Sequence, residues 1–279
     1  MDAATTTTSA AVVPSRIAET FARTASEGRI AVMPYATAGY PTMAISEEIM
    51  VSLVEGGADL IEIGVPFSDP LADGPSVQHT SQVSLNNGTR VQDCIALVQR
   101  LRARGITVPL LLMGYFNPIL KYGIDRYVAD CAAAGVDGFI VPDLPAEESG
   151  PLRDACRAHQ RDLIFMVAPT STDERLELAA TKGSGFIYCV SVKGVTGARD
   201  KMSDTLGEYL ERIRSHTDLP LAVGFGISRP DHVRQVAEHA QGAIVGAALI
   251  NYLDAQPDSE KPAAAARFVR FLKGQADLT

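Results

Sequence analysis

Short apolar runs alternate with helical segments from Ile30 to the end of this 279-residue chain, and this alternation restricts the possible folds more than any other feature. It is typical of repeated strand–helix units, which build a parallel sheet. The number of predicted strands, eight, is the number that closes a (β/α)8 TIM barrel. They cover residues 31–36, 60–63, 109–113, 138–141, 163–167, 186–190, 219–223 and 243–245.

Helical periodicity fills the intervals between these runs, with apolar residues at threes and fours that would face the sheet. The predicted helices cover residues 44–55, 91–104, 124–134, 147–159, 173–181, 206–215 and 230–238. Extra helices are expected at 15–27, before the first strand, and at 262–273, after the last. No linker interrupts the pattern, so we expect a disordered tail over 1–14 and a single barrel domain over 15–279. A doubly wound open sheet is the competing fold. That fold carries a glycine-rich dinucleotide-binding loop after its first strand, and the turn after the first predicted strand of this chain lacks the required glycines.

One loop carries an unusual concentration of carboxylates. Glu62 lies near the end of the second predicted strand, and Asp69 and Asp73 follow in a connection stiffened by prolines and ended by Gly74. If Glu62 points into the core, desolvation would raise its pKa and suit it to proton transfer near neutral pH. Taken alone, Glu62 could equally form an ordinary ion pair, and Asp73 could cap a turn or helix.

Glycines follow the last two strands. Gly224 and Gly226 come after the seventh, and Gly246 after the eighth. Such glycines let backbone amides approach an anion beside helix N-termini, so the sequence predicts a phosphate site, although a tight turn would explain them as well. The polar loop 191–199 resembles one that closes over a ligand. Tyr115 and Tyr188 end strands, where packing is the simpler role.

Composition excludes several classes of function. A net charge of −8 and a pI of about 5.2 argue against non-specific binding to nucleic acid or to anionic membranes. The four cysteines are too far apart in the sequence for a zinc site or a disulfide scaffold, and no histidine pair is spaced for a metal, so we expect no metal. The N-terminal stretch lacks the features of a secretory signal and has no arginine before Arg16, which favours a cytoplasmic location.

Several motifs together resemble the tryptophan synthase alpha subunit family. The strongest is the run from Glu62 through Pro75, preceded by Gly57-Ala58-Asp59. Further matching motifs follow in the family's order at 135–138, 141–148, 194–197 and 224–228. The resemblance covers nearly the whole chain from about Ser15, and it implies a (β/α)8 barrel that cleaves indole-3-glycerol phosphate to indole and glyceraldehyde 3-phosphate.

The resemblance also implies roles for individual residues. Glu62 and Asp73 fall on the family's two catalytic carboxylates: we assign Glu62 to proton transfer at indole C3 and the glycerol hydroxyl, and Asp73 to the indole N–H. Thr196 would close the site, and Asp69 would communicate with a partner. The indole ring would lie near Tyr35, Met113, Tyr115 and Tyr188, and the phosphate on Gly197, Gly224, Phe225, Gly226, Gly246 and Ala247.

The implied partner is a beta subunit that carries pyridoxal phosphate, in an alpha2beta2 heterotetramer, while this chain itself carries no cofactor. The sequence departs from the family at Ala247, where serine is common, at Tyr35, where phenylalanine is common, and over residues 79–85 beside the partner surface. Losing the serine hydroxyl would cost roughly 1 kcal/mol of phosphate binding. One alternative is a stand-alone indole-releasing lyase, which would use the same site residues. A second is a non-catalytic phosphate-binding barrel, against which the presence of both Glu62 and Asp73 argues.

Overall fold

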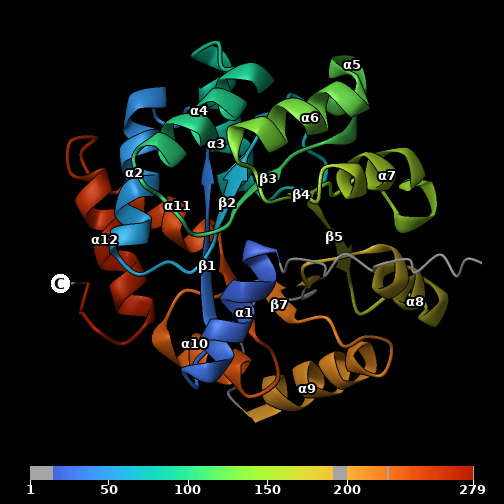
Figure 1. The fold of residues 1–279 in the computed structure, drawn as a ribbon. Coiled ribbons are helices and arrows are strands. Elements are labelled where there is room, and N and C mark those ends of the chain that lie inside the picture. The colour runs from blue at the N-terminus through green and yellow to red at the C-terminus, as the bar shows by residue number, and fades with distance from the viewer. Residues whose placement is uncertain (1–14, 191–199, 225, 279) are drawn as a thin grey trace, which may run out of the picture.

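A closed ring of eight parallel strands forms the centre of the molecule (Figure 1). The computed structural model describes residues 15–190, 200–224 and 226–278. Each strand pairs with its neighbours in chain order, and β1 pairs with both β2 and β8, which closes the ring and excludes the open-sheet alternative. The strands are β1 (Ala31–Thr37), β2 (Ile61–Gly64), β3 (Leu110–Met113), β4 (Gly138–Ile140), β5 (Asp162–Val167), β6 (Ile187–Val190), β7 (Leu221–Gly224) and β8 (Gly242–Val245).

Helices surround the ring (Figure 1). They are α1 (Arg16–Ser26), α2 (Met43–Glu55), α3 (Pro75–Asn86), α4 (Val91–Ala103), α5 (Phe116–Tyr122), α6 (Ile124–Ala134), α7 (Gly150–Ala158), α8 (Asp173–Lys182), α9 (Asp200–Arg214), α10 (Pro230–Ala237), α11 (Ala247–Asp254) and α12 (Lys261–Leu272). The two extra helices predicted at the ends of the chain are therefore confirmed as α1 and α12. The tail predicted over residues 1–14 lies outside the described residues.

The predicted helix over 147–159 is wrong in one respect. A 3-10 turn over Ala146–Glu148 precedes α7, and Ser149 lies between the two. The Ser149 hydroxyl donates to the Ala146 carbonyl at 2.8 Å, and Pro151 has no N–H to continue a helix from that turn. Proline instead suits the first turn of a new helix, where it is found here.

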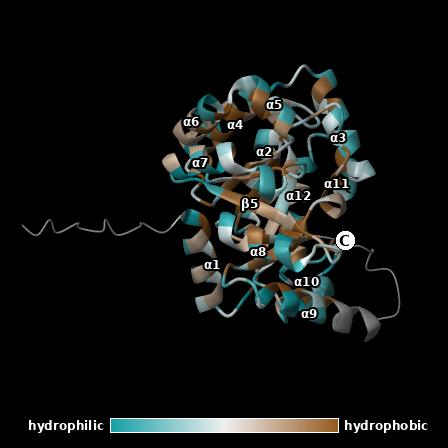
Figure 2. Cartoon of the chain, turned by 90° about the vertical axis from the view of Figure 1, so that its right-hand side faces the viewer, coloured by the Kyte–Doolittle hydropathy of each residue, from teal (hydrophilic) through white to brown (hydrophobic). Residues whose placement is uncertain are grey.

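Apolar side chains fill two layers. Inside the ring, residues such as Met33, Leu111 and Phe186 form one buried cluster, and a larger cluster lies between the strands and the helices. Figure 2 shows hydrophobic strands within and hydrophilic patches on the helices. All four cysteines are free and buried. No helix of the described residues has both the length and the apolar character to cross a membrane.

Helix α1 closes the N-terminal end of the barrel. Its Ile17 and Phe21 belong to the interior cluster, and the Phe21 ring lies 5.7 Å from that of Phe186, centroid to centroid. The opposite end, where the strands finish, is lined by polar side chains and glycines. Reactive groups in this architecture collect at that C-terminal end.

Candidate active site

Glu62 is the most unusual carboxylate of the site. It lies in β2, is 0% exposed, and neither of its carboxylate oxygens has a hydrogen-bond partner. Burial raises its pKa to about 8. An unpartnered buried carboxyl group reduces stability, so its presence at a strand end indicates a chemical role.

Asp73 lies in the loop between β2 and α3 and is partly buried. Burial raises its pKa to about 6, and a hydrogen bond from the Tyr115 hydroxyl offsets part of that rise. The same hydroxyl accepts a hydrogen bond from the Ala72 N–H at 2.9 Å, and the Phe67 ring stacks on the Tyr115 ring with centroids 5.1 Å apart. Tyr115 therefore holds the loop that carries Asp73, a contact beyond the packing role that its sequence position suggests.

Tyr35 and Tyr188 face the two carboxylates. Tyr35 pairs directly with Glu62 in the register of β1 and β2. Burial raises the pKa of both tyrosines, and the charges of Glu62 and Asp73 raise each of them further. That electrostatic effect requires all four groups to lie near one another at the C-terminal mouth.

A short polar chain supports the Tyr35 side chain. The Thr37 hydroxyl donates to the Tyr35 hydroxyl at 3.2 Å and shares a 2.7 Å hydrogen bond with the Thr80 hydroxyl. Sequence reasoning missed Thr37 and Thr80, because they become neighbours only when α3 packs on β1.

Glycines make room for these rings. A Cβ on Gly64 would lie 2.0 Å from the Tyr35 hydroxyl oxygen, and a Cβ on Gly224 would lie 2.4 Å from the Tyr188 ring. A Cβ on Gly246 would be an ordinary 3.7 Å from the Tyr35 Cβ, which brings the start of α11 beside Tyr35. Gly64 was not among the predicted site residues; it pairs with Thr37 in the register of β1 and β2, and that register is not specified by a single sequence.

The N-terminus of α11 is free of side-chain capping. Gly246 is its N-cap residue and makes no side-chain cap bond, and Ala247 opens the helix with an exposed position. Backbone N–H groups at an uncapped helix start are available to an anion. This arrangement is the one expected of a phosphate site, and it depends on the backbone rather than on the serine that Ala247 replaces.

The other predicted site residues are placed as follows. Met113 ends β3 and is partly buried, and Gly226 is exposed with a φ of 64°. Asp69 is exposed and accepts a 2.6 Å hydrogen bond from the Ser68 hydroxyl. Thr196, Gly197 and Phe225 lie outside the described residues.

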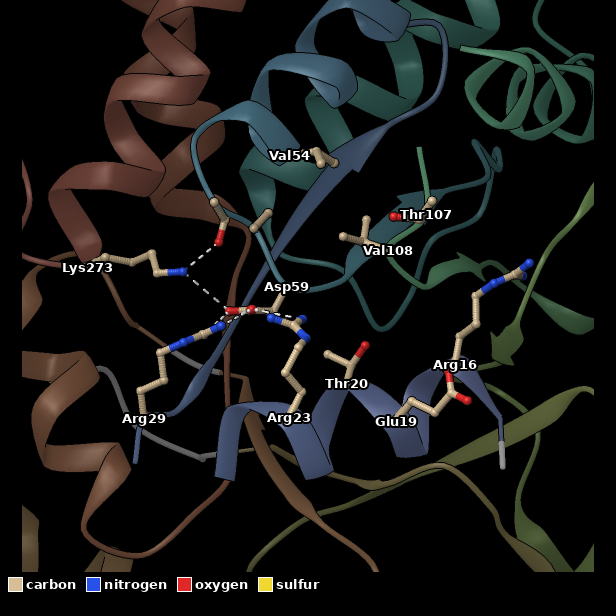
Figure 3. Close-up of a pocket in the computed structure, with 12 residues that line it drawn as sticks. Arg16, Glu19, Thr20, Arg23, Arg29, Val54, Asp59, Thr107, Val108 and Lys273 are labelled. Carbon is tan, nitrogen blue, oxygen red and sulfur yellow. Dashed lines mark hydrogen bonds and ion pairs between the residues drawn. The ribbon is translucent and has the colours of Figure 1, made fainter. Parts of the chain in front are cut away.

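A second buried carboxylate, Asp59, lies among cations at the N-terminal end of the barrel, beside a cavity of about 630 Å³ (Figure 3); these residues are called the Asp59 cluster. Asp59 is 3% exposed there, and Arg29, Arg23 and Lys273 point at it. Burial alone would raise its pKa, but Arg29, the Val32 N–H and Lys273 outweigh that effect and hold it below the usual value. Since its oxygens are fully partnered, Asp59 stabilises the fold and is no candidate for the chemistry.

Within the part of the chain that the structure describes, no group of three histidine, cysteine or acidic side chains could hold a metal ion. The site is thus a carboxylate pair among tyrosines, with an uncapped helix start nearby. A carboxyl group with a strongly raised pKa next to a second carboxyl group with a lower pKa is an arrangement suited to general acid–base catalysis.

The sequence of this chain is similar to those of tryptophan synthase alpha chains. A family model described as "Tryptophan synthase alpha chain" matches residues 21–276. The tryptophan synthase alpha chain of Roseiflexus castenholzii is 54% identical over 260 residues, covering 93% of this chain and 100% of the relative. That of Chloroflexus aurantiacus is 51% identical over 258 residues, covering 92% and 97%.

Solved structures agree with the sequence comparisons. Mycobacterium tuberculosis tryptophan synthase superposes with a TM-score of 0.84 at 36% identity, covering 93% of this chain and 99% of that one. Tryptophan synthase subunit alpha from Legionella pneumophila gives a TM-score of 0.84 at 32% identity, covering 94% and 100%.

Proposed function

This chain belongs to the tryptophan synthase alpha chain family, and from that premise we propose how its residues carry out the reaction. The chain is a carbon–carbon lyase that cleaves indole-3-glycerol phosphate to indole and glyceraldehyde 3-phosphate. It carries no cofactor, and pyridoxal phosphate belongs to the beta subunit. The observation that carries the residue assignment is the pair Glu62 and Asp73, whose pKa values are raised to different extents at one barrel mouth.

Glu62 is assigned the proton transfers. In its protonated form it gives its proton to indole C3, and the ring nitrogen becomes positively charged. The bond between C3 and the glycerol carbon then breaks, its electron pair returns to the ring, and the glycerol oxygen becomes the aldehyde carbonyl. The hydroxyl proton passes to the Glu62 carboxylate, which restores the starting state.

Asp73 is assigned to the indole N–H. As a carboxylate it would accept a charge-assisted hydrogen bond that strengthens as positive charge develops on the ring nitrogen. At neutral pH a group with a pKa of about 8 is mostly protonated and one with a pKa of about 6 is mostly ionised. The two carboxyl groups are therefore in the states that their assigned roles require.

The remaining site residues bind the substrate in this proposal. Tyr35, Met113, Tyr115 and Tyr188 surround the indole ring. The phosphate lies on Gly197, Gly224, Phe225, Gly226, Gly246 and Ala247, supported by the uncapped start of α11. Thr196 closes the site over the substrate.

The partner is the beta subunit, and we infer an alpha2beta2 assembly working in the cytoplasm. The loop that carries Asp73 also carries Asp69 and Leu71, and the Leu71 side chain is 94% exposed. An apolar residue so exposed is a suitable contact for a partner. Because the Ala72 N–H donates to the Tyr115 hydroxyl, a partner contact at Leu71 would act on the segment that Tyr115 holds next to Asp73.

The test is indole release from indole-3-glycerol phosphate by the purified chain, with Glu62→Gln beside it and a beta subunit added in a second series. We expect slow release by the wild type, strong activation by the partner and none from the variant. Fast release without a partner would favour a stand-alone lyase. No release under any condition would leave only a binding role.

A further inference from the structure

A second cavity, of about 780 Å³, lies at the N-terminal end of the barrel, far along the strands from Glu62. One wall is the face of α1 that presents Ala18, Phe21 and Ala22. The other wall is formed by residues that precede strands β5 to β8, among them Leu219 and Pro220. The walls are mainly apolar, and this cavity lies on the opposite face of α1 from the Asp59 cluster.

Asp162, the first residue of β5, lines this cavity, and no contact within the fold accounts for a buried carboxylate at this position. It is 8% exposed, and its buried Oδ2 has no hydrogen-bond partner. Gly138 at the start of β4 and Gly185 just before β6 give it space, because a Cβ on either glycine would lie 3.2 Å from the Asp162 Cβ. A buried carboxylate oxygen without a donor costs free energy, and unlike Asp59 this one has no ion pair among the described residues.

A complementary group stands next to it. Arg161 also lines the cavity, and its Nε is buried without an acceptor. Its nearest ion-pair contact is a long 4.0 Å to Asp137. Arg157, exposed at the rim, makes no ion pair with another described residue. A carboxylate oxygen without a donor and a guanidinium nitrogen without an acceptor thus lie buried beside an apolar cavity, with Arg157 at its rim.

We propose that this cavity binds an α-amino acid with an apolar side chain. The ligand ammonium donates to Asp162 Oδ2, the ligand carboxylate accepts from Arg161 Nε and Arg157, and the side chain packs on Phe21, Ala22 and Leu219. A purely apolar ligand would leave both polar atoms unpartnered, and a simple anion would be repelled by Asp162. A ligand that carries an ammonium and a carboxylate on the same carbon, as an α-amino acid does, satisfies both groups.

Access requires a small movement. Neither Asp162 Oδ2 nor Arg161 Nε touches solvent in this structure, so the carboxylate must turn toward the cavity when the ligand enters. The absent Cβ atoms of Gly138 and Gly185 remove the nearest obstacles to that turn. The exposed Ala18 and Ala22 leave the α1 wall of the cavity open.

The test is isothermal titration calorimetry of the purified chain with L-leucine. We expect one site, and at least tenfold weaker binding of N-acetyl-L-leucine, which lacks the ammonium, of L-leucinamide, which lacks the carboxylate, and of L-glutamate, whose side chain is charged. Asp162→Asn should weaken L-leucine binding at least tenfold while the thermal melting curve stays cooperative. Ala22→Leu, on the exposed face of α1, should block binding by filling the cavity without touching Asp162.

Two controls separate this site from the rest of the molecule. Asp125→Asn, an exposed acid on α6, should bind L-leucine as the wild type does. Glu62→Gln should do the same, because the catalytic mouth is at the other end of the barrel. The proposal is overturned by no titration up to about 20 mM L-leucine, by unchanged affinity in both Asp162→Asn and Ala22→Leu, or by loss of binding in Glu62→Gln.

Discussion

Glu62 and Asp73 define the pH range in which the site can work. Catalysis as assigned needs Asp73 ionised and Glu62 protonated, with pKa values of about 6 and about 8. The plot of kcat/KM against pH is therefore expected to be bell-shaped, falling below about pH 6 and above about pH 8. Steady-state indole release across pH 5 to 9 measures it. A profile that keeps rising through pH 9 would contradict the role given to Glu62.

Glu62 should also limit stability. Its pKa in the folded state, about 8, lies above its ordinary value of 4.5. The free energy of unfolding is therefore not reduced by Glu62 below pH 4.5, and it falls as pH rises from 4.5 toward 8 because the folded state holds the proton more tightly than the unfolded state. Glu62→Gln avoids that loss. We expect the variant to unfold with a free energy higher by on the order of 2 kcal/mol at pH 7 and nearly unchanged at pH 4. Urea denaturation at both pH values tests this, with the exposed Glu208→Gln as the matched control.

Tyr115 adjusts the acid limb of the pH profile. Its hydrogen bond lowers the pKa of Asp73, so Tyr115→Phe should raise that pKa and move the acid limb of kcat/KM upward, by up to about one pH unit. The alkaline limb, which belongs to Glu62, should stay where it is. Tyr122→Phe is the control, because among the residues that the structure describes the Tyr122 hydroxyl bonds only to Asp130, away from the site. A shift of both limbs together would point to a general loosening of the site.

At the scale of elements, β7 must end in glycine for the β6 tyrosine to keep its place. A Cβ at Gly224 would lie 2.4 Å from the Tyr188 ring, and a ring held by a strand cannot move aside cheaply. Gly224→Ala should therefore lower kcat/KM at least tenfold and cost roughly 1–3 kcal/mol of stability. Gly150→Ala, at an α7 position with open space around it, should leave activity unchanged. Kinetics and thermal melting on both variants give the comparison.

Most elements could be predicted from periodicity, but their relations could not. The eight strands follow from apolar runs, and the carboxylates at the end of β2 follow from their position. Helix α5 was missed because it has only seven residues with Pro118 inside it, too short a span for a helical pattern. The Tyr35–Glu62 pairing and the Tyr115–Asp73 hydrogen bond depend on barrel register and on how a loop folds back, which a single sequence does not specify.

At the scale of the whole molecule, the barrel uses carboxylates in opposite ways at its two ends. The C-terminal mouth keeps Glu62 without a partner, at a cost in stability. The N-terminal end holds Asp59 in a set of cations: Arg29 donates to its two oxygens at 2.7 and 2.8 Å, and the Val32 N–H at 3.1 Å. Because Asp59 joins the strand starts to α1 and to the end of α12, it supports the rigid frame on which the mouth with its unpartnered Glu62 is built.

Asp59→Asn should be destabilising in a way that depends on pH. Removing the charge leaves Arg29, Arg23 and Lys273 facing one another, at a cost on the order of 3 kcal/mol at pH 7. The folded pKa of Asp59 lies below its ordinary value of 3.8, so its stabilisation is present above that pH and is lost as pH falls through the folded pKa. The difference between wild type and variant in urea denaturation should therefore shrink in strong acid. Asp231→Asn, which breaks an exposed pair with Arg234, should cost less than about 1 kcal/mol. A difference at Asp59 that stayed constant or grew in acid would mean that packing, and not the charge, holds this end of the barrel.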